Sequence, residues 1–245
     1  MMGLPAKLET YLADGYGRVR GMSSGFSARV VGHLMAAQTA AGQRGGVAEI
    51  GTFEGRFFIA MGLCLAPGEK LFGADTFDWP DAEVETRLRA NMAAHGVVGA
   101  TIWRGNSAGL DAADILAALG GPARIIHVDG DHTDTALTHD LTLAAAVVAQ
   151  HGLIILDDML HPIYPLLVLV VQRFLQARPE WQVAAVIDRE SLSGAAKFVL
   201  ARRVTAPYVL AALEARMARS LVLGAAHFAG YEAPIVSPHP ELPAF

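Results

Sequence analysis

The sequence predicts an α/β fold in which a mostly parallel sheet carries helices on both of its faces. Short apolar runs alternate with helical stretches along most of the 245 residues, and this alternation is typical of parallel strands joined by crossover helices. Several of the runs end directly before glycine or aspartate, as residues 47–50 do before Gly51. Hydrophobic residues make up 53% of the chain and charged residues 18%, which allows a large core and excludes intrinsic disorder for the body of the chain.

The period of the apolar residues and the glycine and proline breaks divide the chain into elements. Strands are expected where apolar residues follow one another, at residues 47–50, 70–74, 101–104, 124–128, 153–156, 181–187 and 196–201. Helices are expected around them, at residues 5–42, 54–65, 81–95, 112–119, 133–150, 165–177 and 207–220. The helix at 81–95 illustrates the signal, because Val84, Leu88 and Met92 are spaced four residues apart and Gly96 ends it.

Charge and cysteine content exclude several classes of function. With 19 basic and 24 acidic residues the net charge is −5, and no long Lys/Arg run is present, so a nucleic-acid partner is not expected. Cys64 is the single cysteine, which excludes a disulfide scaffold and a cysteine-based zinc site. No stretch reaches the roughly 18 apolar residues of a membrane span, and the N-terminus lacks a secretory signal. We therefore expect a cytoplasmic protein without a membrane partner, and the mean hydropathy of +0.35 indicates a thick core or a homo-oligomer.

The first glycine-containing loop has features of a nucleotide-binding turn. Residues Glu49-Ile50-Gly51-Thr52-Phe53-Glu54-Gly55 lead from a strand into a helix, and the helix N-terminus offers free N–H groups to a ligand. Asp75 follows Gly51 by 24 residues, near the distance at which a carboxylate holds ribose hydroxyls. Phe53 stands where a dinucleotide motif has glycine, and Glu49 suits an amino group better than a pyrophosphate. A plain strand-to-helix turn remains the alternative interpretation.

Acidic residues also follow two strands that are expected to be neighbours. They are Asp129, Asp131 and His132 after the first strand, and Asp157 and Asp158 after the second. Because parallel strands lie about 4.8 Å apart, these carboxylates should repel one another. No Lys or Arg occurs between residues 125 and 172, so Mg²⁺, Ca²⁺ or Mn²⁺ is the simplest neutralising partner. The alternative is that the acids cap helices or lie in water, and Asp131 is placed to cap the helix that begins near Thr133.

Four segments in order resemble one protein family. They are VAEIGTFEGR, GADTF, IIHVDGDHTDTALTHDL and GLIILDDM, within about residues 45–200. Together they resemble the class I S-adenosylmethionine (SAM) methyltransferases, in the branch of the macrocin-type and related sugar O-methyltransferases (methyltransferase 24-like). The resemblance implies a Rossmann-like sheet with an antiparallel last strand. The chain is then expected to divide into an N-terminal helical segment at 1–44, which is a lid or dimerisation element, a SAM-binding core at 45–204, and a C-terminal helix with a Pro-rich tail at 205–245.

The resemblance further implies an activity and a set of site residues. The expected reaction is SAM-dependent O-methylation of a small-molecule hydroxyl, assisted by Mg²⁺. The implied cofactor-binding residues are Glu49, Gly51, Thr52, Phe53, Gly55, Asp75, Thr76, Asn106, Ser107 and Asp129. The implied metal ligands are Asp129, Asp157 and Asp158, and the implied base is Asp131 or His132. Thr133-Asp134 departs from the family, which commonly has a tyrosine there.

Two other functions remain open at this level. Asp129-Gly130-Asp131-His132-Thr133 matches the DxDxT motif of haloacid-dehalogenase-like phosphohydrolases, although no Lys follows between residues 134 and 156. A SAM-binding module without turnover, such as a dimeric regulator, is the second alternative. A homodimer could form through residues 205–231.

Overall fold

The computed structural model describes residues 3–191, 194–221 and 224–238. Its strands are β1 (Gly46–Ile50), β2 (Leu71–Asp75), β3 (Thr101–Arg104), β4 (Ala123–Val128), β5 (Val148–Met159), β6 (Trp181–Ile187), β7 (Ala196–Arg202), β8 (Ala225–Phe228) and β9 (Tyr231–Val236). Its α-helices are α1 (Ala6–Thr10), α2 (Gly25–Ala40), α3 (Arg56–Gly62), α4 (Val84–Ala94), α5 (Ala112–Leu119), α6 (Asp134–Val147), α7 (Leu166–Ala177) and α8 (Ala206–Met217). Short helical turns are η1 (Tyr11–Gly15), η2 (Tyr16–Arg18), η3 (Ser107–Gly109) and η4 (Ala218–Ser220).

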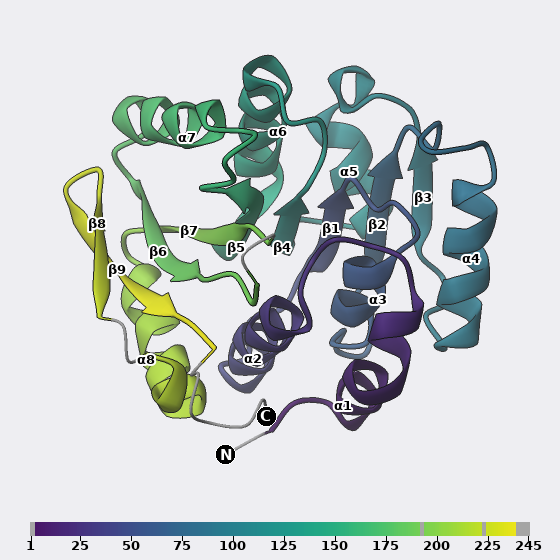
Figure 1. The fold of residues 1–245 in the computed structure, drawn as a ribbon, viewed down its shortest axis with the longest axis horizontal. Coiled ribbons are helices and arrows are strands. Elements are labelled where there is room, and N and C mark those ends of the chain that lie inside the picture. The colour runs from purple at the N-terminus through teal and green to yellow at the C-terminus, as the bar shows by residue number, and fades with distance from the viewer. Residues whose placement is uncertain (1–2, 192–193, 222–223, 239–245) are drawn as a thin grey trace.

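The strands form one sheet in the order β3-β2-β1-β4-β5-β7-β6-β9-β8 (Figure 1). Strands β1 to β5 pair in parallel, whereas β7 is antiparallel to both of its neighbours, β5 and β6. The predicted α/β fold, with a mostly parallel Rossmann-like sheet and an antiparallel strand, is therefore confirmed. Strand β9 adds in parallel to β6, and β8 pairs with β9 in an antiparallel hairpin.

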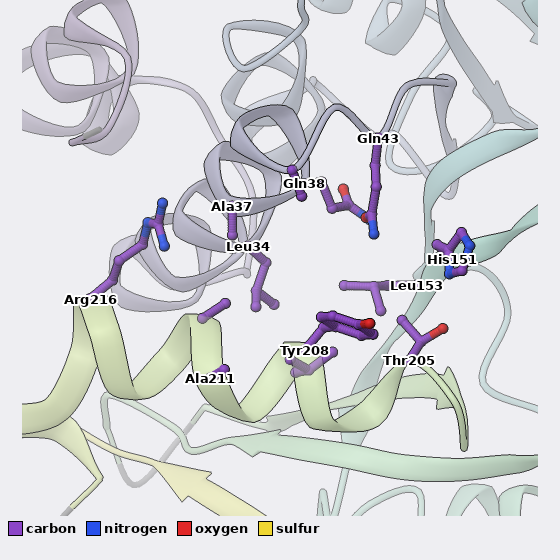
Figure 2. A pocket seen from close by; sticks show the side chains of 13 residues that line it. Leu34, Ala37, Gln38, Gln43, His151, Leu153, Thr205, Tyr208, Ala211 and Arg216 are labelled. Carbon is purple, nitrogen blue, oxygen red and sulfur yellow. The ribbon is translucent and has the colours of Figure 1, made fainter. Parts of the chain in front are cut away.

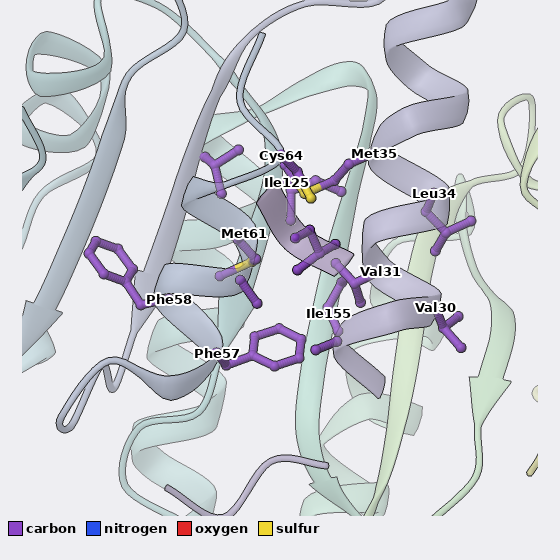
Figure 3. Packing of buried hydrophobic residues seen from close by; sticks show 14 of the residues in the cluster. Val30, Val31, Leu34, Met35, Phe57, Phe58, Met61, Cys64, Ile125 and Ile155 are labelled. Carbon is purple, nitrogen blue, oxygen red and sulfur yellow. The ribbon is translucent and has the colours of Figure 1, made fainter. Parts of the chain in front are cut away.

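Helices cover both faces of the sheet and divide the core into two clusters. Helices α1, α2, α3, α4 and α8 contribute to the cluster on one face, and α5, α6 and α7 contribute to the other. Figure 3 shows the first cluster where side chains of α2 and α3 meet at the sheet, with Phe57 and Met61 facing Val31 and Met35 above Ile155. All residues of β1 and β4 are buried, as expected for strands covered on both sides.

Local sequence signals explain where several helices begin and end. Ser24 caps α2 because its side chain accepts a hydrogen bond from the Ser27 backbone N–H. Asp111 and Asp114 form a capping box at the start of α5, and Gly120 ends that helix in the left-handed conformation. No helix within the described ranges is long and apolar enough to cross a lipid bilayer.

Three boundaries differ from the prediction. The helix expected over residues 5–42 is broken, since Val19 to Ser24 form an extended segment that leads into α2. Residues Val148 to Gln150, expected at the end of a helix, begin β5. The tail expected after the last helix contains the β8–β9 hairpin, which turns at Ala229 and Gly230 with positive φ values of 49° and 84°. The end of that tail, 239–245, lies outside the described residues.

A buried arginine fastens α2 and the segment after α3 to the sheet. The guanidinium of Arg124, on β4, donates to the backbone oxygens of Met35 and Cys64 at 3.0 and 3.1 Å. It also forms an ion pair with Glu69 at 2.7 Å, and the two side chains are only 1% and 4% exposed. Because the pair is buried, removing one partner leaves an uncompensated charge in the interior.

We expect Arg124→Met to lower the free energy of unfolding by about 3–5 kcal/mol, because it leaves the buried Glu69 carboxylate without its counter-charge. The exposed Arg89–Glu85 pair is the matched control, and Arg89→Ala should cost no more than about 0.5 kcal/mol. Urea unfolding followed by circular dichroism measures both values. Equal effects for the two variants would contradict the assignment of Arg124 to a buried structural pair.

Candidate functional site

The register of the parallel strands brings four loops to one level at the carboxyl edge of the sheet. Ile50 pairs with both Ala74 and Val128, and Val128 pairs with Leu156. The next residues along these strands are Gly51, Asp75, Asp129 and Asp157. The sheet therefore gathers three carboxylates and a glycine turn at the edge where α/β proteins bind ligands.

A cavity of about 420 Å³, here called the strand-end cavity, opens above these loops. It is lined by Met22, Ile50, Gly51, Phe53, Ala74, Asp75, Thr76, Trp79, Gly105, Asn106, Ser107, Asp129, Gly130, Asp131, His132, Ala136 and Tyr164. Of the predicted site residues, Gly51, Phe53, Asp75, Thr76, Asn106, Ser107, Asp129, Asp131 and His132 are among them. The cavity is large enough for a nucleoside-sized ligand and lies where the sequence predicted one.

Gly51 permits a close approach between the first and fourth strand ends. A side-chain Cβ at this position would lie 1.8 Å from the carbonyl oxygen of Asp129, and Gly51 has a φ of 89°. The backbone N–H of Asp129 donates to Ile50 O at 2.8 Å beside it. Only glycine is compatible with both the conformation and the space. The first loop thus abuts the backbone of Asp129 at the floor of the cavity.

Asp75 shapes the loop around the second strand end. Its carboxylate accepts hydrogen bonds from the backbone N–H groups of Phe53 at 2.7 Å and Phe77 at 2.8 Å. Both of these residues have positive φ values, 48° and 56°, which residues other than glycine rarely adopt. Each carboxylate oxygen keeps a second lone pair for a ligand hydroxyl. Asp75 therefore both stabilises the strained loops and presents an acceptor to the cavity.

Three of the predicted cofactor residues, Glu49, Thr52 and Gly55, do not line the strand-end cavity. Glu49 is 1% exposed, and its Oε1 lies 2.6 Å from Nδ1 of the buried His127. Burial, followed by the charge of Asp129, raises the pKa of Glu49 well above its usual range. Gly55 precedes α3 with a φ of 93°, and its N–H donates to Thr52 O. Glu49, Thr52 and Gly55 therefore support the loop after β1 without facing the strand-end cavity.

A second cavity of about 280 Å³, here called the neighbouring cavity, adjoins the first. Its lining includes Ser23 of the extended segment before α2, Asp157 and Asp158 at the β5 end, Glu190 between β6 and β7, and Lys197 of β7. Four residues line both cavities: Met22, Asp129, His132 and Tyr164. These four residues form the partition across which two bound molecules would meet.

His132 is the charged centre of that partition. Its Nε2 lies 2.7 Å from an oxygen of Asp158 and 3.8 Å from one of Asp129, and its ring stacks on Tyr164 at 4.2 Å. Partial burial lowers the pKa of His132, but the hydrogen bonds and charges of Asp129 and Asp158 outweigh it and raise the pKa to about 10. Burial and the nearby Asp157 charge raise the pKa of Asp129 to about 8. Both groups therefore keep their protons at neutral pH and release them in the alkaline range.

Asp131, the other candidate base, is exposed and lines only the strand-end cavity. The expectation that Asp131 caps the following helix is wrong. Helix α6 begins at Asp134, and the hydroxyl of Thr133 accepts from the Ala136 N–H at 3.2 Å as its cap. The physical reason is spacing, because a cap contacts the N–H two or three residues ahead. The Asp131 carboxylate instead accepts a hydrogen bond from the Thr133 hydroxyl at 3.2 Å.

The expected metal ligands divide into two sets in the structure. Among the described residues, the ligand atoms of Asp129, His132 and Asp158 lie within 4.8 Å of one another, and so do those of His127, Asp129 and Asp157. Neither set holds Asp157 together with Asp158. Asp157 forms an ion pair with Lys197, and the Ser23 hydroxyl donates to it at 2.8 Å. Although burial opposes it, Lys197 with His127 holds the pKa of Asp157 well below its usual range. The three predicted carboxylates therefore do not form one ready Mg²⁺ site.

Several site residues carry no sequence motif and were not among the predicted ones. Met22 and Tyr164 come from loops, whereas Lys197 comes from a strand and is 2% exposed. Lys197 did leave a signal, because a lysine inside the apolar run Ala196-Lys197-Phe198-Val199-Leu200 must find an anionic partner if that strand is buried. The acids after the preceding strands were the available partners.

A third cavity, of about 250 Å³, lies away from the strand ends (Figure 2). It is enclosed by α2 and α8, with Leu34 and Ala37 on one side and Tyr208 and Ala211 on the other. Its lining is mostly apolar and includes no carboxylate. Its ionisable side chains are His151, Tyr208 and Arg216, whereas the carboxylates and His132 gather at the strand ends, where we place the candidate site.

Comparisons with known proteins agree with this location. Residues 48–159 match the model of a family described as a methyltransferase domain. This span runs from the first strand through the β5 acid pair and contains the predicted cofactor and acidic residues. A comparison with curated protein sequences finds no significant match.

Solved structures share the fold. An O-methyltransferase from Bacillus cereus in complex with S-adenosylhomocysteine (SAH) superimposes with a TM-score of 0.60 at 14% identity, covering 81% of this chain and 91% of that one. A putative O-methyltransferase from Klebsiella pneumoniae gives 0.55 at 23% identity, with 80% and 89% covered. The O-methyltransferase TomG from Streptomyces achromogenes, involved in tomaymycin synthesis and in complex with SAM, gives 0.55 at 20% identity, with the same coverage.

The raised pKa of His132 makes a prediction about pH. The proton on His132 stabilises the fold fully below about pH 6.5, the usual value for histidine, and that contribution is lost as the pH rises through about 10. We expect the His132 ring to titrate near pH 10 by NMR and at a lower pH in Asp158→Asn, which removes the closer carboxylate. In Asp14→Asn, an exposed control, the titration should not change. Titration of wild-type His132 near pH 6.5 would contradict the ion pair.

The resemblance of the four sequence segments to methyltransferases is confirmed over residues 48–159, which match the methyltransferase-domain family. The match covers the strands β1 to β5 that carry most of the site. The chain as a whole has the Rossmann-like fold of the solved O-methyltransferase structures.

Proposed function

We propose that this protein transfers the methyl group of SAM to the hydroxyl oxygen of a small molecule. The observation that supports this most is the pair of adjoining cavities, which share the partition of Met22, Asp129, His132 and Tyr164. One cavity carries the features of a nucleoside site, and the other is a small, polar space suited to an acceptor. Bringing two reactants together across one wall supplies much of the rate in a direct transfer.

The strand-end cavity fits SAM by its donor set. Asp75 would hold the ribose hydroxyls, and the Phe53 and Trp79 rings, whose centroids lie 5.6 Å apart, form an aromatic border beside it. Asn106 and Ser107 lie at the third strand end and would border the base, as the sequence resemblance implies. SAM supplies an activated methyl group on a sulfonium. The carboxylate of Asp75 gives the cavity a negative charge that suits a sulfonium and an ammonium group, and Asp129 adds a second charge above about pH 8.

Calorimetry with SAH tests the cofactor assignment. We expect wild-type protein to bind SAH, and Asp75→Asn to bind it about 10- to 100-fold more weakly, because a hydrogen bond to a charged group contributes about 1.5–3 kcal/mol. Asp14→Asn is the control, since Asp14 is exposed and does not line the cavity. If the wild type binds neither SAH nor SAM, the proposed function is wrong.

For removal of the acceptor proton we propose His132, acting with Asp129, in preference to Asp131. His132 borders both cavities, whereas Asp131 borders only the strand-end cavity. His132 holds its proton up to about pH 10 and Asp129 up to about pH 8. A group that accepts a proton must first be free of its own. The pair therefore accepts a proton most readily at alkaline pH, where Asp129 has lost its proton and His132 begins to lose its own.

We expect the methyl-transfer rate to rise with pH between about 8 and 10, as Asp129 and then His132 lose protons. His132→Gln should lower kcat by roughly 10²- to 10⁴-fold and flatten the pH profile, with little change in SAH affinity. Asp131→Asn is the matched comparison and should keep most of the activity. Product formation from labelled SAM, with a panel of phenols and sugar hydroxyls, gives the rates. The reverse ranking of the two variants would identify Asp131 as the base.

The remaining expectations stay proposals. Metal assistance finds its support in the set of Asp129, His132 and Asp158, while Asp157 is held by Lys197. A homo-oligomer is supported by exposed apolar side chains near α8, such as Val204 and Tyr208 at 64% and 65% exposure. A cytoplasmic location stays a prediction. SAH binding without transfer to any acceptor would favour the non-catalytic module, and no feature of the fold favours the phosphohydrolase.

A further inference from the structure

Lys197 enters the site from a strand that the sequence motifs do not include. It lies on β7 between Ala196, which pairs with Met159, and Phe198, which pairs with Leu156. The register of β5 shifts between Leu156 and Met159, so Asp157 and Asp158 form a bulge opposite Lys197. Asp158 has a positive φ of 55° within this bulge. The irregularity turns the acid pair toward the lysine and the neighbouring cavity.

The ammonium of Lys197 has three polar neighbours. It forms an ion pair with Asp157, donates to the Ser23 hydroxyl at 2.9 Å, and lies 3.2 Å from Nε2 of His127. It also lies 4.7 Å from the centre of the Phe57 ring. The side chain is 3% exposed, so these contacts are shielded from water. An ammonium carries three donors and no acceptor, and two of them are used by Asp157 and Ser23.

Asp157 is occupied on both of its oxygens. Oδ2 receives the Lys197 ammonium and the Ser23 hydroxyl, and Oδ1 accepts from the backbone N–H of Asp158 at 2.8 Å. A divalent cation bound to Asp157 would have to displace these donors. It would also lie within a few ångströms of a buried positive charge, where repulsion is strong because the local dielectric is low.

We propose that Lys197 is the resident cation of this site and takes the place that the sequence assigned to Mg²⁺ at Asp157. In this arrangement Lys197 is a positioning residue. It neutralises Asp157, holds Ser23 and with it the segment before α2 against the neighbouring cavity, and keeps divalent metal away from Asp157. The inference rests on the proposed function, because it concerns the acceptor side of the same site.

One consequence concerns the acceptor. A metal ion commonly orients an acceptor by binding its oxygen directly, whereas here the acceptor would be oriented by the protein groups of the neighbouring cavity. These include Ser24, Asp158, His161 and Glu190. An acceptor then needs no second oxygen to chelate a metal. The substrate class extends to small molecules with a single hydroxyl.

The test is calorimetric titration of Mn²⁺, and separately Mg²⁺, into the protein saturated with SAH. We expect the wild type to bind no metal through Asp157, so Asp157→Asn should leave its titration unchanged. Lys197→Met, which keeps the length of the side chain without its charge, should bind Mn²⁺ at least about tenfold more tightly, since a nearby positive charge is gone and Asp157 is free. Lys197→Arg keeps the charge and should behave as the wild type does. A purely structural role for Lys197 would not produce a gain of metal binding that the Arg variant lacks.

Two outcomes would overturn the inference. One is stoichiometric Mn²⁺ or Mg²⁺ binding by the wild type that Asp157→Asn abolishes and Asp158→Asn does not, which decides the matter even if Lys197→Met does not fold. The other is a folded Lys197→Met variant, verified by circular dichroism, that gains no affinity for Mn²⁺. SAH affinity, measured first in each protein, tests the proposed function separately. Failure of the cofactor assignment is therefore distinguishable from failure of the metal inference.

Discussion

The common level at which β2, β1, β4 and β5 end is the constraint on which the rest of the site depends. Because Ile50 is in register with Ala74 and Val128, the residues that follow must share one edge of the sheet. This alignment leaves so little room between the first and fourth strand ends that position 51 must be glycine. The same alignment brings Asp75 within reach of the loop after β1 and sets Asp129 between two cavities. Binding residues far apart in the chain are thus positioned by backbone hydrogen bonds.

Gathering carboxylates at one edge creates an electrostatic cost that the remaining elements must offset. Two cationic side chains do so, one on each side of the acid pair after β5. His132 approaches Asp158 from the loop after β4, and Lys197 approaches Asp157 from β7. The partly buried imidazolium borders both cavities, whereas the buried ammonium is enclosed by His127, Ser23 and Phe57. The His132 imidazolium is therefore suited to proton transfer, and the Lys197 ammonium is suited to holding the site residues in place.

The sequence alone predicted the parallel strands and the loops that follow them, because buried strands read as apolar runs ending in glycine or aspartate. It failed where the deciding partner is distant in the chain. Nothing local marks Lys197 as the partner of Asp157, which lies 40 positions earlier. The β8–β9 hairpin was missed because its turn uses Ala229 and Gly230 in place of an asparagine–glycine pair. The helix break before Ser24 was missed because residues 19–24 are fixed by contacts with Arg56 and Asp157.

The insertion of β7 between β5 and β6 has a consequence for how the molecule is assembled. Strands β5 and β6 are both synthesised before β7, yet they are joined in the sheet only through it. A nascent chain that stops short of residue 197 has Asp157 at a sheet edge without its counter-charge, and Ser23 without the anchor that holds it in place. The contact of Ser23 with Lys197 can therefore form only after β7 is added, whereas the contacts of Tyr16 and Arg56 with the same segment need no residue of that strand.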